Sequence, residues 1–155
     1  DIEEIRELLK AKGKVVSENE DLDAEGEKIL GEIVLERYKS PLVFALNYPW
    51  AKRPFYHMRP ANNLKGTKSF DLIYQGVEIG TGAQREHRLE ILEAQAKEKG
   101  IDIGKMKFYQ DIFKFGCPPH GGVGLGLDRI VEQMLHLPNI REAILLPRDP
   151  ERLTP

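Results

Sequence analysis

A glycine-rich run near the C-terminal end, GGVGLGLDRI at residues 121–130, constrains the fold more than any other part of this sequence. Alternating glycines leave no side chain between the backbone and a ligand, and they accept φ and ψ values that other residues resist. After Gly126 the spacing of apolar residues changes to that of an amphipathic helix. We therefore predict a strand that runs into a helix at Gly126. The N–H groups of the helix N-terminus and the guanidinium of Arg129 would attract an anion there.

Two familiar glycine motifs do not fit this run. A dinucleotide-binding fingerprint has the pattern G-x-G-x-x-G, but counting from Gly122 places Leu127 where the third glycine belongs. A phosphate-binding P-loop from Gly121 to Gly126 lacks the Lys and the Ser or Thr that should follow. A glycine-rich bulge with a surface arginine remains an alternative for this stretch taken alone.

The size and charge of the chain narrow the classes of function. With 155 residues it has the length of one domain, and its net charge of −2 gives no overall attraction to nucleic acid. The single cysteine, Cys117, cannot form an internal disulfide, and no apolar run approaches the roughly 20 residues of a membrane span. A cytoplasmic location fits these features. Because the sequence starts with Asp1 rather than Met, we expect a processed, shortened or partial chain.

The spacing of apolar residues predicts the order of helices and strands. Helices are expected at residues 2–10, 27–38, 85–100, 106–115 and 127–137. Strands are expected at residues 42–48, where the strand should be buried, 70–79 and 121–126, and a short turn with a closing strand is expected at 140–148. An acidic loop at 17–25 should face solvent, and Phe108, Ile112 and Phe115 should share one side of their helix. Together these elements predict a mixed α/β fold, in which helices flank a mainly antiparallel sheet around one core.

Three oxygen-bearing side chains lie in or near the strand predicted at residues 70–79. The carboxylates of Asp71 and Glu78 and the hydroxyl of Thr81 are the hard ligands that Mg²⁺ prefers when it also keeps waters and phosphates. Seven residues of strand span about 23 Å, so Asp71 and Glu78 can share an ion only if the strand bends near Gly76. Glu78 with Thr81 is the easier pair. Ordinary solvent-facing carboxylates are the alternative.

Three ordered motifs together resemble a known family. They are GVEIGTGAQREH at residues 76–87, PPHGG followed by GLGLDR at 118–129, and PRDP followed by RLTP at 147–155. The glycine run resembles motif 3 of the class II aminoacyl-tRNA synthetases, and the set as a whole is similar to aspartyl-tRNA synthetases of the archaeal type. RPFY at residues 53–56 is also similar to the archaeal and eukaryotic members. The resemblance covers essentially the whole chain.

The resemblance implies a role for each matching position. Glu78 would bind ATP through Mg²⁺, Thr81 would contact the metal and the amino acid, and Arg85 would bind the side-chain carboxylate of aspartate. Asp71 would support a further Mg²⁺. Arg129 would stack on the nucleotide or neutralise it, and with Glu78 it would form the catalytic pair. The segment that contacts ATP would comprise Gly126, Leu127, Asp128 and Arg129.

The implied activity is that of an aspartate-tRNA ligase. Attack of the aspartate α-carboxylate on the α-phosphorus of ATP gives aspartyl-adenylate and pyrophosphate, and the aspartyl group then passes to the terminal ribose of tRNA. No protein nucleophile is needed, because the site has only to align two anions and neutralise their charge. The implied partners are Mg²⁺, ATP, L-aspartate and tRNA, with a homodimer at full length and no membrane.

Several parts of the family pattern do not occur in this sequence. We find no motif 1, no motif 2 and no anticodon-binding β-barrel, so residues 1–155 are expected to be the C-terminal part of a class II catalytic domain. We expect such a chain to be inactive by itself in forming the adenylate. The alternative is a synthetase-derived paralogue, which makes asparagine or acts as a regulatory or binding module and does not charge tRNA.

Overall fold

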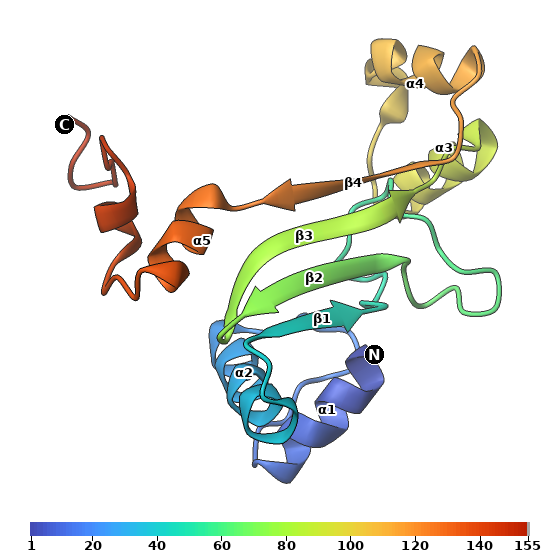
Figure 1. The fold of residues 1–155 in the computed structure, drawn as a ribbon. Coiled ribbons are helices and arrows are strands. Elements are labelled where there is room, and N and C mark those ends of the chain that lie inside the picture. Colours follow the sequence, from blue (N-terminus) through green and yellow to red (C-terminus); the bar gives the residue numbers. More distant parts are fainter. Residues whose placement is uncertain (155) are drawn as a thin grey trace.

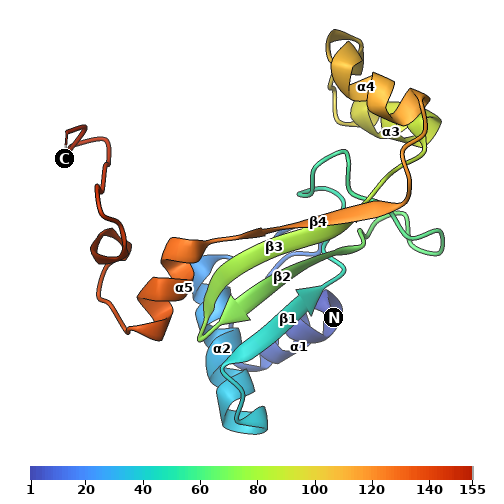
Figure 2. The same ribbon diagram turned by 45° about the horizontal axis from the view of Figure 1, so that its top comes forward.

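The computed structural model describes residues 1–154, and it contains a four-stranded antiparallel sheet with the spatial order β1-β2-β3-β4. The strands are β1 (Leu42–Leu46), β2 (Ser69–Tyr74), β3 (Val77–Arg85) and β4 (His120–Leu125). The helices are α1 (Ile2–Ala11), α2 (Ala24–Tyr38), α3 (Leu89–Glu98), α4 (Lys107–Lys114) and α5 (Leu127–Met134). Helices α1 and α2 lie together beside β1, α3 and α4 lie beyond one end of the sheet, and α5 lies beyond the other (Figures 1 and 2). The predicted mixed fold with an antiparallel sheet is confirmed.

Residues 70–79 form a hairpin, so the single strand predicted there is wrong. Strand β2 ends at Tyr74, and the turn consists of Gln75 and Gly76, whose φ angles are 49° and 82°. Strand β3 then returns alongside β2. A two-residue turn with two positive φ angles matches the right-handed twist of an antiparallel pair, and it favours glycine because glycine has no Cβ.

Helices α1 and α2 pack on one face of the sheet and form the first of two hydrophobic clusters. Its members are Ile2, Ile5, Leu9, Leu30, Val34, Ala45, Tyr48 and Ile73. Helix α2 begins at Ala24, earlier than predicted, because the Asp23 side chain accepts the N–H of Gly26 at 2.8 Å and caps the helix. Gly31 allows α2 to approach the β2–β3 turn, since a Cβ on Gly31 would lie 2.5 Å from the backbone nitrogen of Gly76.

A second hydrophobic cluster joins α3 and α4 to the loop after β1, so the prediction of one core is wrong. Its members are Trp50, Phe55, Leu92, Ala96, Ile103 and Phe113. Helix α4 buries Phe113, which packs edge-to-face on Tyr109 with ring centroids 4.9 Å apart. Phe108, Ile112 and Phe115, the side predicted to be apolar, are 74%, 57% and 80% exposed. Because α4 packs only at its Tyr109–Phe113 side, the more apolar side of the helix faces outward.

Strand β1 lies at an edge of the sheet and is buried on one face only, which corrects the prediction of a buried strand at 42–48. Ala45 is fully buried against the helices, but Leu42, Phe44 and Leu46 on the opposite face are 42–55% exposed. The continuous apolar run at 42–48 therefore forms a strand that is covered on one face only. Nothing among residues 1–154 covers its second face.

The segment after α5 does not return to the sheet, so the closing strand predicted at 140–148 is wrong. It begins with a 3₁₀ helix, η2 (Ile140–Ala143), in which the Asn139 side chain accepts the N–H of Arg141 at 3.0 Å. This segment lies beyond α5 (Figure 1), away from any strand with which it could pair. Within residues 1–154, no helix combines the length and the apolar character that crossing a bilayer requires.

Candidate active site

The pairing of β2 with β3 places three candidate side chains on one face of the sheet. Asp71 lies opposite Thr81, and after a shift in register Ile73 lies opposite Glu78. Residues opposite each other in an antiparallel pair share a face, as does every second residue along a strand. The pKa of Glu78 is raised by its burial and then by the negative charge of Asp71. The expected bend near Gly76 is a complete reversal of the chain, which places both carboxylates on the same face of the sheet.

Arg53, from the loop after β1, joins two of these candidates. Its guanidinium donates to the two carboxylate oxygens of Asp71 at 2.6 and 3.1 Å and to the Thr81 hydroxyl at 3.3 Å. It lies 3.8 Å from the centroid of the Tyr48 ring, and its Nε is 3.6 Å from a carboxylate oxygen of Asp21. Burial lowers the pKa of Arg53, but the hydrogen bond and the charge of Asp71 outweigh it and leave the pKa raised. Arg53 therefore remains a buried cation.

The contacts of Arg53 with Asp21 and Asp71 change two expectations from the sequence. Asp21 lies in the acidic stretch at 17–25 that was expected to face solvent, yet it is partly buried against Arg53, and this burial raises its pKa. Asp71 gives both its oxygens to Arg53, so a metal ion would have to compete with a guanidinium for them. Sequence reasoning missed Arg53 as a site residue. The only local signal is a lone arginine before Pro54 in an aromatic loop.

The strand-to-helix junction lies where the glycine pattern predicts it. Strand β4 ends at Leu125 and α5 begins at Leu127, while the N–H of Gly126 donates to the carbonyl oxygen of Ile79 at 2.8 Å. Leu127 is 70% exposed, and the next residue, Asp128, is also exposed in the first turn of the helix. The junction is thus tied to β3 and leaves the first turn of α5 open.

Arg129 and Glu27 both contact Glu78. The Nη1 of Arg129 donates to the carbonyl oxygen of Glu78 at 2.7 Å and lies 3.9 Å from its Oε1. The N–H of Glu78 donates to Oε2 of Glu27, in the first turn of α2, at 2.9 Å. The pKa of Glu27 is raised, first by burial, which outweighs this hydrogen bond. Glu27 was not predicted as a site residue, because nothing in the local sequence links α2 to β3.

Arg85 is the last residue of β3 and does not begin a helix as expected. Its guanidinium lies over Gly122 of β4, where a Cβ would be 2.7 Å from Nη2, and 5.5 Å from the centroid of the Tyr56 ring. Gly122 therefore makes room for an arginine of the protein itself. A Cβ on Gly124 would have no neighbour closer than the carbonyl oxygen of Thr81 at 4.0 Å, so the backbone at Gly124 is open on this side.

His57 lies beside Arg85 and is another residue that the sequence did not single out. It is 7% exposed, forms an antiparallel bridge with Arg85, and its Nδ1 has no hydrogen-bond partner among residues 1–154. Burial lowers its pKa to about 4, with the positive charges of Arg53 and Arg85 adding to the effect. His57 is therefore a neutral imidazole at pH 7.

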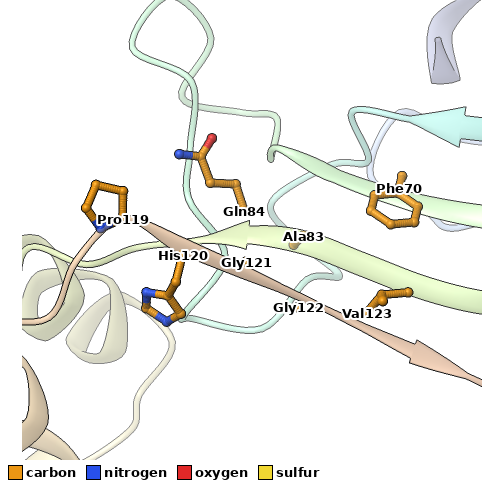
Figure 3. A pocket seen from close by; sticks show the side chains of 8 residues that line it. All are labelled: Phe70, Ala83, Gln84, Pro119, His120, Gly121, Gly122 and Val123. Atoms are coloured by element: carbon orange, nitrogen blue, oxygen red, sulfur yellow. The ribbon is translucent and has the colours of Figure 1, made fainter.

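Two cavities lie along this sheet, and their linings differ. One of about 600 Å³ has no Asp, Glu, Lys or Arg in its lining, which consists of Phe70, Ala83, Gln84, Pro119, His120, Gly121, Gly122 and Val123 (Figure 3). The other, of about 470 Å³, lies between α2, the hairpin and α5, and it is bordered by Glu27, Lys28, Glu78 and Arg129. The smaller cavity holds the charged groups that anions and a metal ion need, so we place that part of the candidate site there. Thr81 and Arg85 do not belong to its lining.

The acidic side chains fit a metal ion only together with a ligand. Among residues 1–154, no three side chains of His, Cys, Asp or Glu group closely enough to hold a metal ion. Mg²⁺, however, takes one or two carboxylates and completes its shell with waters and substrate phosphates. Glu78 suits this role because its side chain is 31% exposed and its ion contact with Arg129 is long, at 3.9 Å. Thr81 is exposed on the same face and can add a hydroxyl.

The antiparallel sheet whose glycine strand enters α5 has the fold of a class of protein, the class II aminoacyl-tRNA synthetases. The model of the family "tRNA synthetases class II (D, K and N)" matches residues 3–150, and the chain belongs to this family. Its sequence is 53% identical over 150 residues to the aspartate–tRNA(Asp/Asn) ligase of Aeropyrum pernix, and the match covers 96% of this chain and 34% of that protein.

Solved structures give the same family. The aspartyl-tRNA synthetase from Entamoeba histolytica is 39% identical with a TM-score of 0.95, covering 99% of this chain and 32% of that one. The asparaginyl-tRNA synthetase from Pyrococcus horikoshii, solved with asparaginyl-adenylate, is 34% identical with a TM-score of 0.91, covering 99% of this chain and 35% of that one. The chain thus spans about a third of the length of the proteins that it matches.

Proposed function

We propose that this chain carries the Mg²⁺–ATP and aspartate contacts of an aspartate–tRNA ligase, which activates aspartate as aspartyl-adenylate and transfers it to tRNA. The observation that carries the proposal is the succession of Glu78, Thr81 and Arg85 along β3, with Arg129 of α5 hydrogen-bonded to the backbone of Glu78. The similarity to aspartate–tRNA ligases supports the same reaction. A homodimer and an aspartate or asparagine tRNA as acceptor belong to this proposal.

Each charged group has a task that its chemistry suits. The guanidinium of Arg85, exposed at the end of β3, pairs bidentately with the side-chain carboxylate of aspartate. Arg129 is 49% exposed and lies in the first turn of α5, where its charge adds to that of the helix N-terminus and neutralises the nucleotide. Gly126, Leu127 and Asp128 present backbone and open surface to ATP. Nothing in this arrangement requires a nucleophile from the protein.

Glu78 and Thr81 would hold Mg²⁺, with Asp71 as a less direct contributor because Arg53 pairs with it. When bound, the ion supplies charge that screens the phosphate oxygens of ATP. Glu78 would approach the ion because it lines the cavity between α2 and α5 and its side chain is 31% exposed. Arg53 donates to both oxygens of the Asp71 carboxylate and to the Thr81 hydroxyl, so it fixes the orientation of that hydroxyl.

The test is aspartate-dependent exchange of pyrophosphate into ATP, measured in the full-length protein that contains this chain. Arg85→Leu should lower kcat/KM for aspartate by about a hundredfold or more, since losing a desolvated charge pair costs roughly 3 kcal/mol. Arg37→Leu is the matched control, because Arg37 is an exposed arginine at the end of α2, away from the site. An Arg85→Leu protein that retains the exchange rate of Arg37→Leu would refute the aspartate assignment.

A second candidate, distinct from the paralogue that makes asparagine or acts as a binding module, is a ligase of the same family that activates asparagine instead of aspartate. The TM-score of 0.91 to an asparaginyl-tRNA synthetase is the observation that favours it. The same assay separates the two candidates when asparagine replaces aspartate. A guanidinium pairs well with a carboxylate and poorly with an amide, so Arg85 favours aspartate as the substrate. Exchange with asparagine alone would support the second candidate.

A further inference from the structure

The backbone of Glu78 is held by charged side chains from two other elements. Its N–H donates to the carboxylate of Glu27 in α2 at 2.9 Å, and its carbonyl oxygen accepts from Arg129 in α5 at 2.7 Å. Strand β4 pairs with β3 only as far as Leu125 opposite Gly80, so Glu78 lies beyond the end of this pairing. The side chains of Glu27 and Arg129 thus form the hydrogen bonds that the N–H and the carbonyl oxygen of Glu78 cannot form with β4.

The position of Glu27 depends on an unusually close approach of α2 to the β2–β3 turn. A Cβ on Gly31 of α2 would lie 2.5 Å from the backbone nitrogen of Gly76, and a Cβ on Gly76 would lie 2.8 Å from the Cα of Lys28. Both contacts involve backbone atoms, so neither glycine can gain a side chain unless the helix and the turn separate. The helix is therefore fixed at the distance that lets Glu27 reach the N–H of Glu78.

We propose that Glu27 is a positioning residue, which holds the Glu78 backbone so that the Glu78 carboxylate projects into the cavity of about 470 Å³ between α2 and α5. Glu27 acts through its oxygen as a hydrogen-bond acceptor and not through its charge. The inference rests on the proposed role of Glu78 as a ligand of Mg²⁺ with ATP. Groups that orient a metal ligand through hydrogen bonds matter nearly as much as the ligand itself.

The experiment compares Glu27→Gln, which keeps the acceptor and removes the charge, with Glu27→Ala, which removes both. Glu32→Ala is the matched control, because Glu32 is an exposed glutamate on the same helix. In the full-length protein, calorimetric titration with ATP at a series of Mg²⁺ concentrations measures the Mg²⁺ requirement without any turnover. We expect Glu27→Ala to raise this requirement about tenfold or more, and Glu27→Gln to stay near the parent protein.

Hydrogen–deuterium exchange of the peptide that carries the Glu78 amide gives a second measurement that does not involve ATP. The amide should be protected in the parent protein and in Glu27→Gln, and it should exchange faster in Glu27→Ala. An unprotected amide in the parent protein would overturn the inference even if Glu27→Ala failed to fold. Equal defects in Glu27→Gln and Glu27→Ala would also overturn it, because Glu27 would then act through its charge.

The failure of this inference can be told apart from the failure of the proposed function. If Glu78→Gln raises the Mg²⁺ requirement and Glu27→Ala does not, the metal site stands and the positioning role of Glu27 is refuted. If Glu78→Gln binds ATP with the Mg²⁺ dependence of the parent protein, the metal site itself is refuted, and the role of Glu27 is refuted with it.

Discussion

Replacing Arg53 by Met should destabilise this protein strongly, because it would leave the Asp71 carboxylate buried without its cationic partner. The two side chains are 9% and 7% exposed, and the guanidinium donates to both carboxylate oxygens at 2.6 and 3.1 Å. Breaking a buried pair from one side typically costs about 3–5 kcal/mol, most of it the penalty of an uncompensated buried charge. We expect a loss of unfolding free energy in that range.

A second ion pair of the same chain supplies the comparison. Arg59 and Glu98 approach to 2.7 Å, as closely as Arg53 and Asp71, but the Glu98 side chain is 50% exposed. Water screens this pair, so Arg59→Met should cost about 1 kcal/mol or less through the ion pair. Comparing Arg53→Met with Arg59→Met thus tests whether the burial of an ion pair, and not its distance, determines the loss of stability.

The assay is urea unfolding of the 155-residue chain, followed by the fluorescence of its single tryptophan, Trp50. A double variant, Arg53→Met with Asp71→Leu, removes both charges and should recover most of the loss, because apolar residues can replace a buried pair with little cost. The coupling energy should exceed about 2 kcal/mol. If Arg53→Met costs less than about 1 kcal/mol, or if the double variant costs the sum of the single ones, the buried pair does not stabilise the fold in the way argued here.

Three further changes test other features of the structure. Glu78→Gln should raise the Mg²⁺ concentration needed for pyrophosphate exchange, and identical titration curves for Glu78→Gln and the exposed control Glu32→Gln would make Glu78 structural. Gly31→Ala should cost about 1–3 kcal/mol in thermal or urea unfolding, because its Cβ would overlap the backbone of Gly76, whereas Ala normally favours a helix over Gly. The buried His57 should make stability fall with acid. Burial holds the pKa of His57 in the folded state at about 4, below its value of roughly 6.5 in the unfolded state. Between these two pH values the unfolded state binds a proton that the folded state does not bind. The stability present above pH 6.5 is therefore lost as pH falls toward 4. His57→Gln should flatten this part of the stability–pH curve, and an unchanged curve would show that His57 is not its cause.

The sequence by itself determined the local features of this protein. The alternation of glycines up to Gly126 and the helical spacing after it predict the change from β4 to α5, because both patterns depend on neighbouring residues only. The helical spacing of α1 and α2 is predicted for the same reason, with an error at the start of α2 where the Asp23 cap decides the boundary. The mixed fold and the family also follow from the sequence, since three motifs in order carry the resemblance.

Only the tertiary structure decided how the candidate residues meet. The turn at Gln75 and Gly76 reverses the chain and sets Asp71 opposite Thr81, which the prediction of one strand at 70–79 did not reveal. Arg53 reaches Asp71 from 18 positions away in the sequence, and Glu27 reaches the backbone of Glu78 from 51 positions away. Such contacts arise because a buried charge or backbone group must find a partner wherever the packed chain supplies one. Sequence spacing cannot predict that partner, because the packing of α2 and of the loop after β1 against the sheet brings it into place.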